Sequence, residues 1–264
     1  MKKYLEVAKL RFKSQLAWRF DIMASVLISL VKILFAIIVW GAVFGTQDTV
    51  AGFTLQTMVS YYIINAFLSQ LDMSESIASD VSSSIRGGTF SKYMILPVKV
   101  EGYFLWQMLG MAAMYVLFTS VGIGLCVTLF RIDFVITSDP VLILSAALMV
   151  LMGLIMMAQL NFFLGLLTLK FNDIGNFLMI KDLIMEFIKG GLIPLALLPP
   201  AVIAVMRCLP FYYITYLPSM LLIGRGGEEI TMGLITLAGW MVILLAINSI
   251  TYERLRRKYD GVGI

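Results

Sequence analysis

Residues 141–169 read VLILSAALMVLMGLIMMAQLNFFLGLLTL and contain no charged side chain. At about 1.5 Å per residue, a helix of this length exceeds the roughly 30 Å hydrocarbon core of a bilayer. The apolar residues run continuously instead of alternating with polar ones, which excludes a strand of a membrane β-barrel. The stretch therefore predicts a transmembrane helix.

Four further apolar runs are long and continuous enough to span a membrane, namely residues 22–44, 52–71, 103–130 and 230–250. A sixth run, residues 177–204, carries charges in its first half and Gly190, Gly191 and Pro194 in its second. We therefore predict an all-α, polytopic membrane protein with six transmembrane helices, of which the fifth is irregular. Residues 1–264 form a single domain in this interpretation.

The composition excludes most other classes of protein. The 264 residues are 60% hydrophobic and 14% charged, whereas soluble domains are about 45–50% apolar and about 25% charged. Histidine is absent, which removes imidazole bases and histidine-ligated metals. No Gly-x-x-x-x-Gly-Lys-[Ser/Thr] phosphate loop occurs either. We therefore predict no catalytic residue, no metal site and no cofactor in this chain.

Basic residues are distributed unevenly between the two sides of the predicted bundle. Sixteen Lys and Arg residues precede the first span, lie between spans 2 and 3, occupy residues 170–189 or follow the last span, against three in the other loops. Because loops rich in Lys and Arg remain in the cytoplasm, both termini are expected on the cytoplasmic side. The protein itself is expected in the cell membrane of a bacterium. The excess of Lys and Arg over Asp and Glu then reflects the orientation of the protein in the membrane and contact with anionic lipid. No nucleic-acid partner is expected.

Residues 1–20 are not expected to be a secretion signal, because charges interrupt the region that such a signal keeps apolar. Helical spacing relates four apolar residues in this segment, Leu5, Ala8, Phe12 and Leu16. The pattern predicts an amphipathic helix that lies in the cytoplasmic interface of the membrane. The alternative is an ordinary basic anchor for the first span.

The longest segment outside the spans is the loop of residues 72–101, which contains a short amphipathic pattern. Apolar residues recur there every four positions, at Ile77, Val81 and Ile85. Ser74 is expected to cap the start of this helix, and Gly87 and Gly88 to end it. Such a helix either docks into a groove of a soluble partner or covers the base of the bundle.

Charged residues within the predicted spans are candidate functional residues by default. Lys32 lies near the middle of the first span, where a cation costs roughly 2.5–3.5 kcal/mol on insertion scales. Asp182, Glu186 and Lys189 follow helical spacing and share one face of the fifth span. These charges line a pathway, pair with one another, or lie closer to the cytoplasm than the predicted bounds of the spans place them.

Three segments carry a resemblance to a known family. The loop segment Ile77-Ala-Ser-Asp80…Ile85-Arg86-Gly87…Leu96-Pro97 resembles the first cytoplasmic loop of ABC type-2 transporter permeases, in the small six-span branch of that family. The Gly/Pro-rich segment of residues 190–218 is similar to the connection between spans 5 and 6 of that branch. The tail, with Tyr259, Gly261 and Gly263, looks like its closing segment.

The resemblance implies a permease subunit of an ATP-driven exporter that moves a hydrophobic or amphipathic substrate, such as a drug, peptide or lipid, out of the cell. Two permeases, identical or paired with a sister permease, would stand on two copies of an ABC ATP-binding subunit that holds ATP and Mg²⁺. Residues 199–218 would fold back as short, partly inserted helices near the outer face. The helix in loop 72–101 would be the coupling helix, with four residues facing the ATPase, Glu75, Asp80, Ser84 and Arg86.

A second class of function stays open from the sequence. A non-transporting integral membrane scaffold, or an intramembrane lipid-modifying protein, would share the same hydropathy. The lack of histidine and of any clustered polar triad weighs against the enzyme. An adjacent gene for a phosphate-loop ATPase would distinguish a permease from either alternative.

Overall fold

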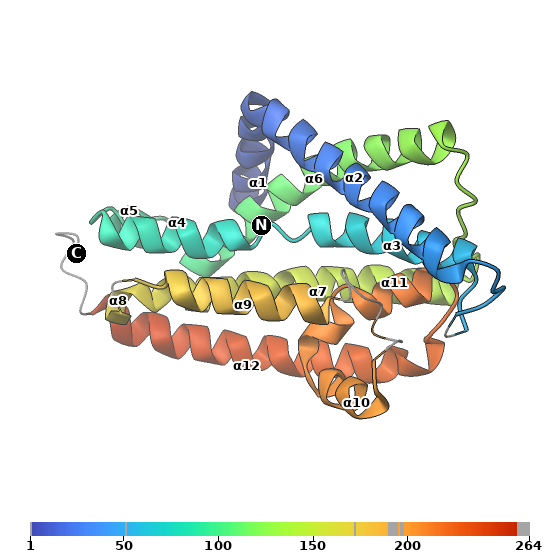
Figure 1. Ribbon diagram of the computed structural model, residues 1–264. Coiled ribbons are helices and arrows are strands. Elements are labelled where there is room, and N and C mark those ends of the chain that lie inside the picture. Colours follow the sequence, from blue (N-terminus) through green and yellow to red (C-terminus); the bar gives the residue numbers. More distant parts are fainter. Residues whose placement is uncertain (1, 51, 172, 190–194, 196–197, 258–264) are drawn as a thin grey trace.

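A computed structural model describes residues 2–50, 52–171, 173–189, 195 and 198–257 of the chain (Figure 1). The described residues are 81% helical and contain no β-strand. The prediction of an all-α protein is therefore confirmed.

Within the described part of the chain, four helices are long and apolar enough to cross a membrane. They are α2 (Arg19–Phe44), α6 (Val100–Leu129), α7 (Pro140–Leu166) and α12 (Ile230–Arg256). These helices correspond to the first, third, fourth and sixth predicted spans. Asp139 begins α7 by accepting a hydrogen bond from the Val141 N–H, and Pro140 occupies the first helical position, where its missing N–H costs nothing.

The second predicted span forms a shorter helix, α3 (Leu55–Gln70), which begins at a capping box between Thr54 and Thr57. Its 16 residues extend about 24 Å, less than a typical hydrocarbon core. Together with the broken fifth run, this leaves four candidate spans, or five if one bent helix pair is a span. The six-span count stays a prediction.

The fifth predicted run is not one helix. Its first half forms α9 (Gly175–Ile188), and helix resumes at α10 (Pro200–Cys208). Gly190, Gly191 and Pro194, which predicted the interruption, lie outside the described residues, as does the tail from residue 258. After α10, a bend of 91° leads into residues 210–222. This region contains η3 (Pro210–Tyr213) and α11 (Tyr216–Leu222).

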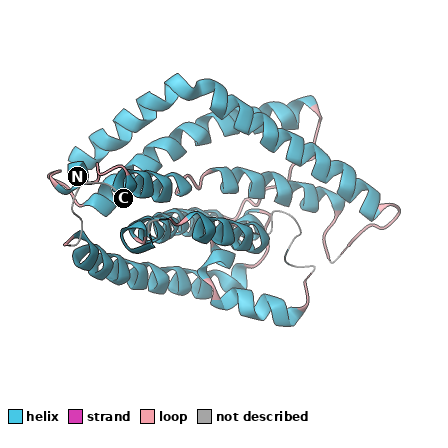
Figure 2. Cartoon of the chain, turned by 60° about the vertical axis from the view of Figure 1, so that its left-hand side comes forward, coloured by secondary structure: helices cyan, strands magenta, loops and turns pink. Residues whose placement is uncertain are grey.

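Helix α7 lies at the centre of the arrangement, and it contacts α12, α11, α6 and the loop helix α4 (Glu75–Arg86). Figure 1 shows α7, α9 and α12 side by side and α2 and α6 inclined to them, with α4 and the short helices α5 (Ser91–Met94) and α8 (Thr168–Phe171) gathered at one end of the bundle. Figure 2 shows the same helices turned by 60°. We call this the α4 end. The C-terminal end of α12 lies at the same end (Figure 1).

Helix α1 (Lys2–Gln15) lies across the first half of α6 and runs crosswise to α7 and α12 in Figure 1. The Tyr4 ring stacks on Trp106 of α6 with centroids 6.2 Å apart, and the Tyr4 hydroxyl accepts a hydrogen bond from the Lys99 N–H at 3.1 Å. Leu5 and Leu10 remain exposed. The helix therefore exists as predicted and is also packed firmly on a span, whereas its place at the membrane surface stays a prediction.

We expect Gly110→Ala to loosen the contact between α1 and α6. A Cβ at Gly110 would lie 2.3 Å from the carbonyl oxygen of Ala8, a backbone atom that can move only with α1 itself. Overpacking of this kind costs about 1–3 kcal/mol, so trypsin should cleave α1 faster. Gly124→Ala on the same helix is the control, because no described atom lies within 4 Å of its added Cβ. Equal cleavage rates in the two variants would contradict the packing described for α1.

Candidate functional site

The apolar stripe of α4 packs inside this chain. Ile77, Val81 and Ile85 are all buried, and α4 contacts α7, α6 and α8. Gly165 of α7 permits the closest approach, since a Cβ there would lie 2.8 Å from the Cβ of Val81. The stripe thus covers the base of the bundle and is not available to a groove on a soluble partner. Gly88, with φ of 67°, ends the helix as predicted.

The four α4 residues predicted to face an ATPase fall into three environments. Glu75 and Arg86 are exposed, and Asp80 is half-buried. Ser84 is buried, with 7% of its surface exposed, which corrects its expected outward position. The physical reason is helical spacing, because Ser84 stands seven residues after Ile77 and so shares its face.

Asp80 lies within electrostatic reach of two basic residues from other segments, Arg11 of α1 and Lys92 of α5. Partial burial raises the pKa of the Asp80 carboxyl above its usual value, and the two cations offset part of that rise. Because it is half-buried and near these cations, the Asp80 carboxylate is a less direct candidate for contact with a partner than Glu75 or Arg86.

The start of α4 is held by a buried polar contact in place of the predicted cap. The Ser74 side chain makes no capping hydrogen bond. Its hydroxyl donates to Asp72 Oδ1 at 2.5 Å and accepts from Asn161 Nδ2 of α7 at 2.8 Å. Asn161 is fully buried. These two bonds tie the corner between α3 and α4 to the central helix.

Asp72 also forms an ion pair across the fold. The Lys189 ammonium, next to the end of α9, lies 3.0 Å from Asp72 Oδ2. Only 4% of the Asp72 side chain and 16% of the Lys189 side chain are exposed. The Lys189 carbonyl also accepts a hydrogen bond from Asn65 Nδ2 of α3 at 2.9 Å. Both contacts join α9 to α3.

Lys181 supplies a second link from α9. Its ammonium donates to Asn161 Oδ1 at 3.1 Å, and it lies 2.6 Å from Asp182 and 3.9 Å from Glu75. The corner residues Asp72 and Ser74, the amide of Asn161 and the two lysines of α9 thus form one polar network. We call it the corner network, and it connects α3, α4, α7 and α9.

The corner network borders a cavity of about 590 Å³ between α2, α3 and the end of α9. Two helical faces form most of its wall. The α2 face contributes Ser29, Lys32, Ile33, Phe35, Ala36, Val39 and Trp40, and the α3 face contributes Tyr62, Asn65, Ala66, Ser69 and Gln70. Asp72, Glu75 and Lys189 complete the lining.

The cavity is polar at the α4 end and mostly apolar farther along. Gln70 Nε2 donates to Ser29 Oγ at 2.5 Å near the polar end. Trp40 and Tyr62 lie at the other end, with ring centroids 6.0 Å apart. Lys32 lies between the two ends. No carboxylate of the described chain approaches its ammonium within 4.0 Å.

The structure thus brings together three charged residues that were singled out separately, Lys32, Glu75 and Lys189. Of the described span-5 charges, Asp182 pairs with Lys181 of the same helix at 2.6 Å, whereas Lys189 pairs with Asp72 outside it at 3.0 Å. The Glu186 side chain lies outside the described part of the chain.

Four residues of the site were missed at the sequence level, Asn65, Asp72, Asn161 and Lys181. Asn65 and Asn161 are strongly hydrogen-bonding amides within long apolar stretches, and Asn161 follows another amide, Gln159, by two residues. A buried amide needs a partner, so an amide in such a stretch is the signal that could have found them. Asp72 and Lys181 stand among other charges, and their sequence context does not separate them.

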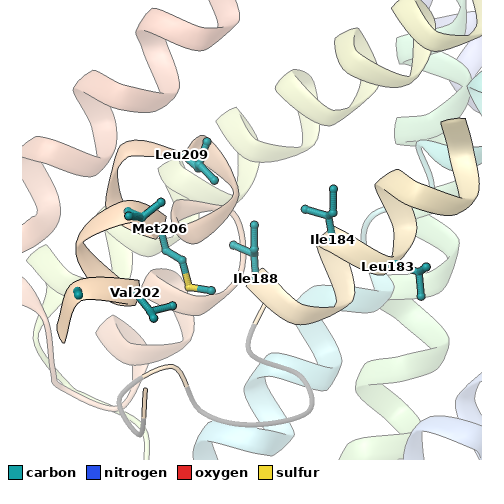
Figure 3. A pocket seen from close by; sticks show the side chains of 8 residues that line it. Leu183, Ile184, Ile188, Val202, Met206 and Leu209 are labelled. Carbon is teal, nitrogen blue, oxygen red and sulfur yellow. The ribbon is translucent and has the colours of Figure 1, made fainter. Parts of the chain in front are cut away.

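A second, apolar groove of about 650 Å³ lies between α9 and α10 (Figure 3). Figure 3 shows Ile184 and Ile188 of α9 on one side and Val202 and Met206 of α10 on the other. Every lining residue is apolar. The groove therefore offers a surface for hydrocarbon and no group for chemistry. Within the described residues, no three acidic or cysteine side chains are placed to hold a metal ion.

Comparison with known proteins gives one family. Residues 30–263 match the family described as ABC-2 family transporter protein. No curated protein matches the chain. The matched residues include α4, α9 and nearly the whole lining of the cavity, whereas α1 and the start of α2 precede them.

Proposed function

The chain belongs to the ABC-2 family of transporter proteins, and from this membership we propose that it is the permease subunit of an ATP-driven exporter. A separate ABC subunit, in two copies, binds ATP and Mg²⁺ and hydrolyses the nucleotide. The permease acts in pairs, with a second copy of itself or with a sister permease. Its substrate is hydrophobic or amphipathic, such as a drug, peptide or lipid, and moves out of the cell.

One observation carries this proposal, namely the two-sided character of α4. Its apolar face is anchored in the bundle against Gly165, and its polar face presents Glu75 and Arg86 to the surroundings. A helix of this kind is suited to receive force from a soluble subunit and pass it to a membrane helix. In the proposed assembly the α4 end is cytoplasmic and α4 is the coupling helix.

The corner network supports a route from α4 to the cavity. Ser74 and Asp72 stand at the start of α4, and they bind Asn161 of α7 and Lys189 at the end of α9. In our proposal, closure of the ATPase on ATP displaces α4, and these buried bonds carry the displacement to the helices around the cavity. The cavity is then the part of the pathway that changes its access.

The test is co-purification with the ABC ATPase encoded nearest to the gene of this chain. We expect a stable complex in which the permease stimulates ATP hydrolysis. The double variant Glu75→Ala/Arg86→Ala should weaken binding of the ATPase at least about tenfold, since exposed Arg residues are common interface hot spots.

The matched control is Glu6→Ala/Lys9→Ala, which removes an exposed charge pair of α1 whose atoms lie 3.0 Å apart. This control should bind the ATPase as the unmodified chain does. If the permease purifies as a stable complex without any ATPase when both are produced, or if the α4 variant binds normally, the proposed function is wrong.

A further inference from the structure

Among the described side chains of the cavity lining, Lys32 is the charge without an ionic partner, and it is exposed. Asp72 and Lys189 neutralise one another at 3.0 Å, and Glu75 lies 3.9 Å from Lys181. In contrast, the Lys32 ammonium has no carboxylate of the described chain within 4.0 Å. A cation at membrane depth is retained at a cost, so an anion that reaches it is bound favourably.

The residues around Lys32 indicate the apolar character of the ligand as well as the sign of its charge. Phe35, Val39 and Trp40 continue the same face of α2 beyond Lys32, and Tyr62 faces them from α3. This part of the wall is apolar and aromatic, apart from the Tyr62 hydroxyl. Asn65 lies on α3, three residues after Tyr62, and its amide already donates a hydrogen bond to the Lys189 carbonyl. The site therefore provides one cationic point beside an apolar chamber.

From this arrangement we infer that the cavity binds anionic amphiphiles, with the negative head at Lys32 and the apolar body against Trp40, Phe35 and Tyr62. The inference rests on the proposed function and narrows its substrate class from hydrophobic or amphipathic compounds to those with a negative head group. An exported amphiphile and an anionic lipid of the bilayer share this chemistry.

The experiment uses Trp40 as a reporter, because it lies in the cavity wall. The chain has four tryptophans, and three are replaced by Phe to leave Trp40 alone. Energy transfer from Trp40 to 11-dansylaminoundecanoate is titrated in maltoside micelles, and compared with transfer to the methyl ester of the same probe. A variant that keeps only Trp106, which stacks on Tyr4 away from the cavity, reports the nonspecific partition of each probe.

We expect the carboxylate probe to bind about tenfold or more tightly than its ester. Lys32→Gln should abolish this preference, Lys32→Arg should retain it, and Lys13→Gln, an exposed lysine of α1, should leave it unchanged. Equal affinities for the two probes in the unmodified site would overturn the inference. So would a preference that survives Lys32→Gln, or one that the Trp106 variant reproduces.

Nanodiscs separate the two sources of ligand. Where phosphatidylglycerol displaces the carboxylate probe and phosphatidylcholine does not, the anionic amphiphile is a bilayer lipid. Where neither displaces it, the site serves an exported anion. Neither measurement needs ATP or an ATPase, so loss of the anion preference leaves the permease assignment intact. A failed co-purification would instead remove that assignment while leaving the probe data unaffected.

Discussion

Replacing Asp72 by Asn is expected to lower the free energy of unfolding by about 3–5 kcal/mol, the usual cost of removing one partner from a buried ion pair. The variant leaves the Lys189 ammonium, 16% exposed, without its anion. It also weakens the hydrogen bonds that Asp72 accepts from the Ser74 hydroxyl and N–H. Thermal unfolding of the purified permease in detergent measures the effect.

The dependence of stability on pH provides a second measurement for the same pair. Burial by itself would raise the pKa of the Asp72 carboxyl, but Lys189 and Ser74 outweigh it and hold the pKa below its ordinary value of 3.8. The stabilising contribution is therefore present above pH 3.8 and is lost as the pH falls through the lowered pKa. Asp72→Asn should lack this acid-dependent loss.

The double variant Asp72→Asn/Lys189→Gln is the control, because it removes both charges and leaves no buried ion without a partner. It should be clearly more stable than Asp72→Asn alone. If the single and double variants unfold at the same temperature, the Lys189 ammonium is not destabilising without Asp72. The ion pair then does not hold the corner network together.

The second large effect is expected for Gly165→Ala, at the crossing of α4 and α7. The added Cβ would lie 2.8 Å from the Val81 Cβ and 3.3 Å from the Cα of Ala78. Both atoms belong to the stem of a side chain or to the backbone, so the helices themselves must separate. We expect a loss of about 1–3 kcal/mol in stability and a larger loss in the stimulation of the ATPase.

The decisive measurement is a cycle with Val81→Gly. This second substitution removes both the Cβ and the Cγ1 of Val81, which lie 2.8 and 2.9 Å from the added Cβ. The double variant should therefore recover part of the ATPase stimulation that Gly165→Ala loses, measured against the single variant Val81→Gly. Gly41→Ala in α2 serves as the control, because its Cβ would meet no described atom within 4 Å. Full stimulation in Gly165→Ala would show that the crossing transmits nothing to the ATPase.

Local pattern was sufficient to predict most of the fold. Apolar runs of 20 or more residues predicted α2, α6, α7 and α12, and a four-residue repeat predicted the buried stripe of α4. These features depend only on residues close together in the chain. The length of α3 was overestimated, because the predicted span of residues 52–71 includes Gly52, Phe53 and Thr54, which precede the helix.

The candidate site was predicted only as separate residues. Lys32 and Lys189 were recognised as costly charges, yet nothing near either of them in the sequence indicates that they line one cavity. The ion pair between Asp72 and Lys189 joins residues 117 positions apart, so it depends on how α3 and α9 pack. Ser84 was misplaced for a different reason, since its outward position was inferred from the family resemblance, although its spacing from Ile77 places it on the inward face of the helix.

The packing of α1 on α6 has a consequence for biosynthesis. Tyr4 and Ala8 leave the ribosome about 100 residues before their partners Lys99 and Gly110. At synthesis rates of about 5–20 residues per second, α1 waits roughly 5–20 s for its docking surface. During that interval a nascent chain carries α1 and α2 without α6, so α1 lacks the surface on which it packs. The final contacts of α1 thus depend on residues that are made well after it.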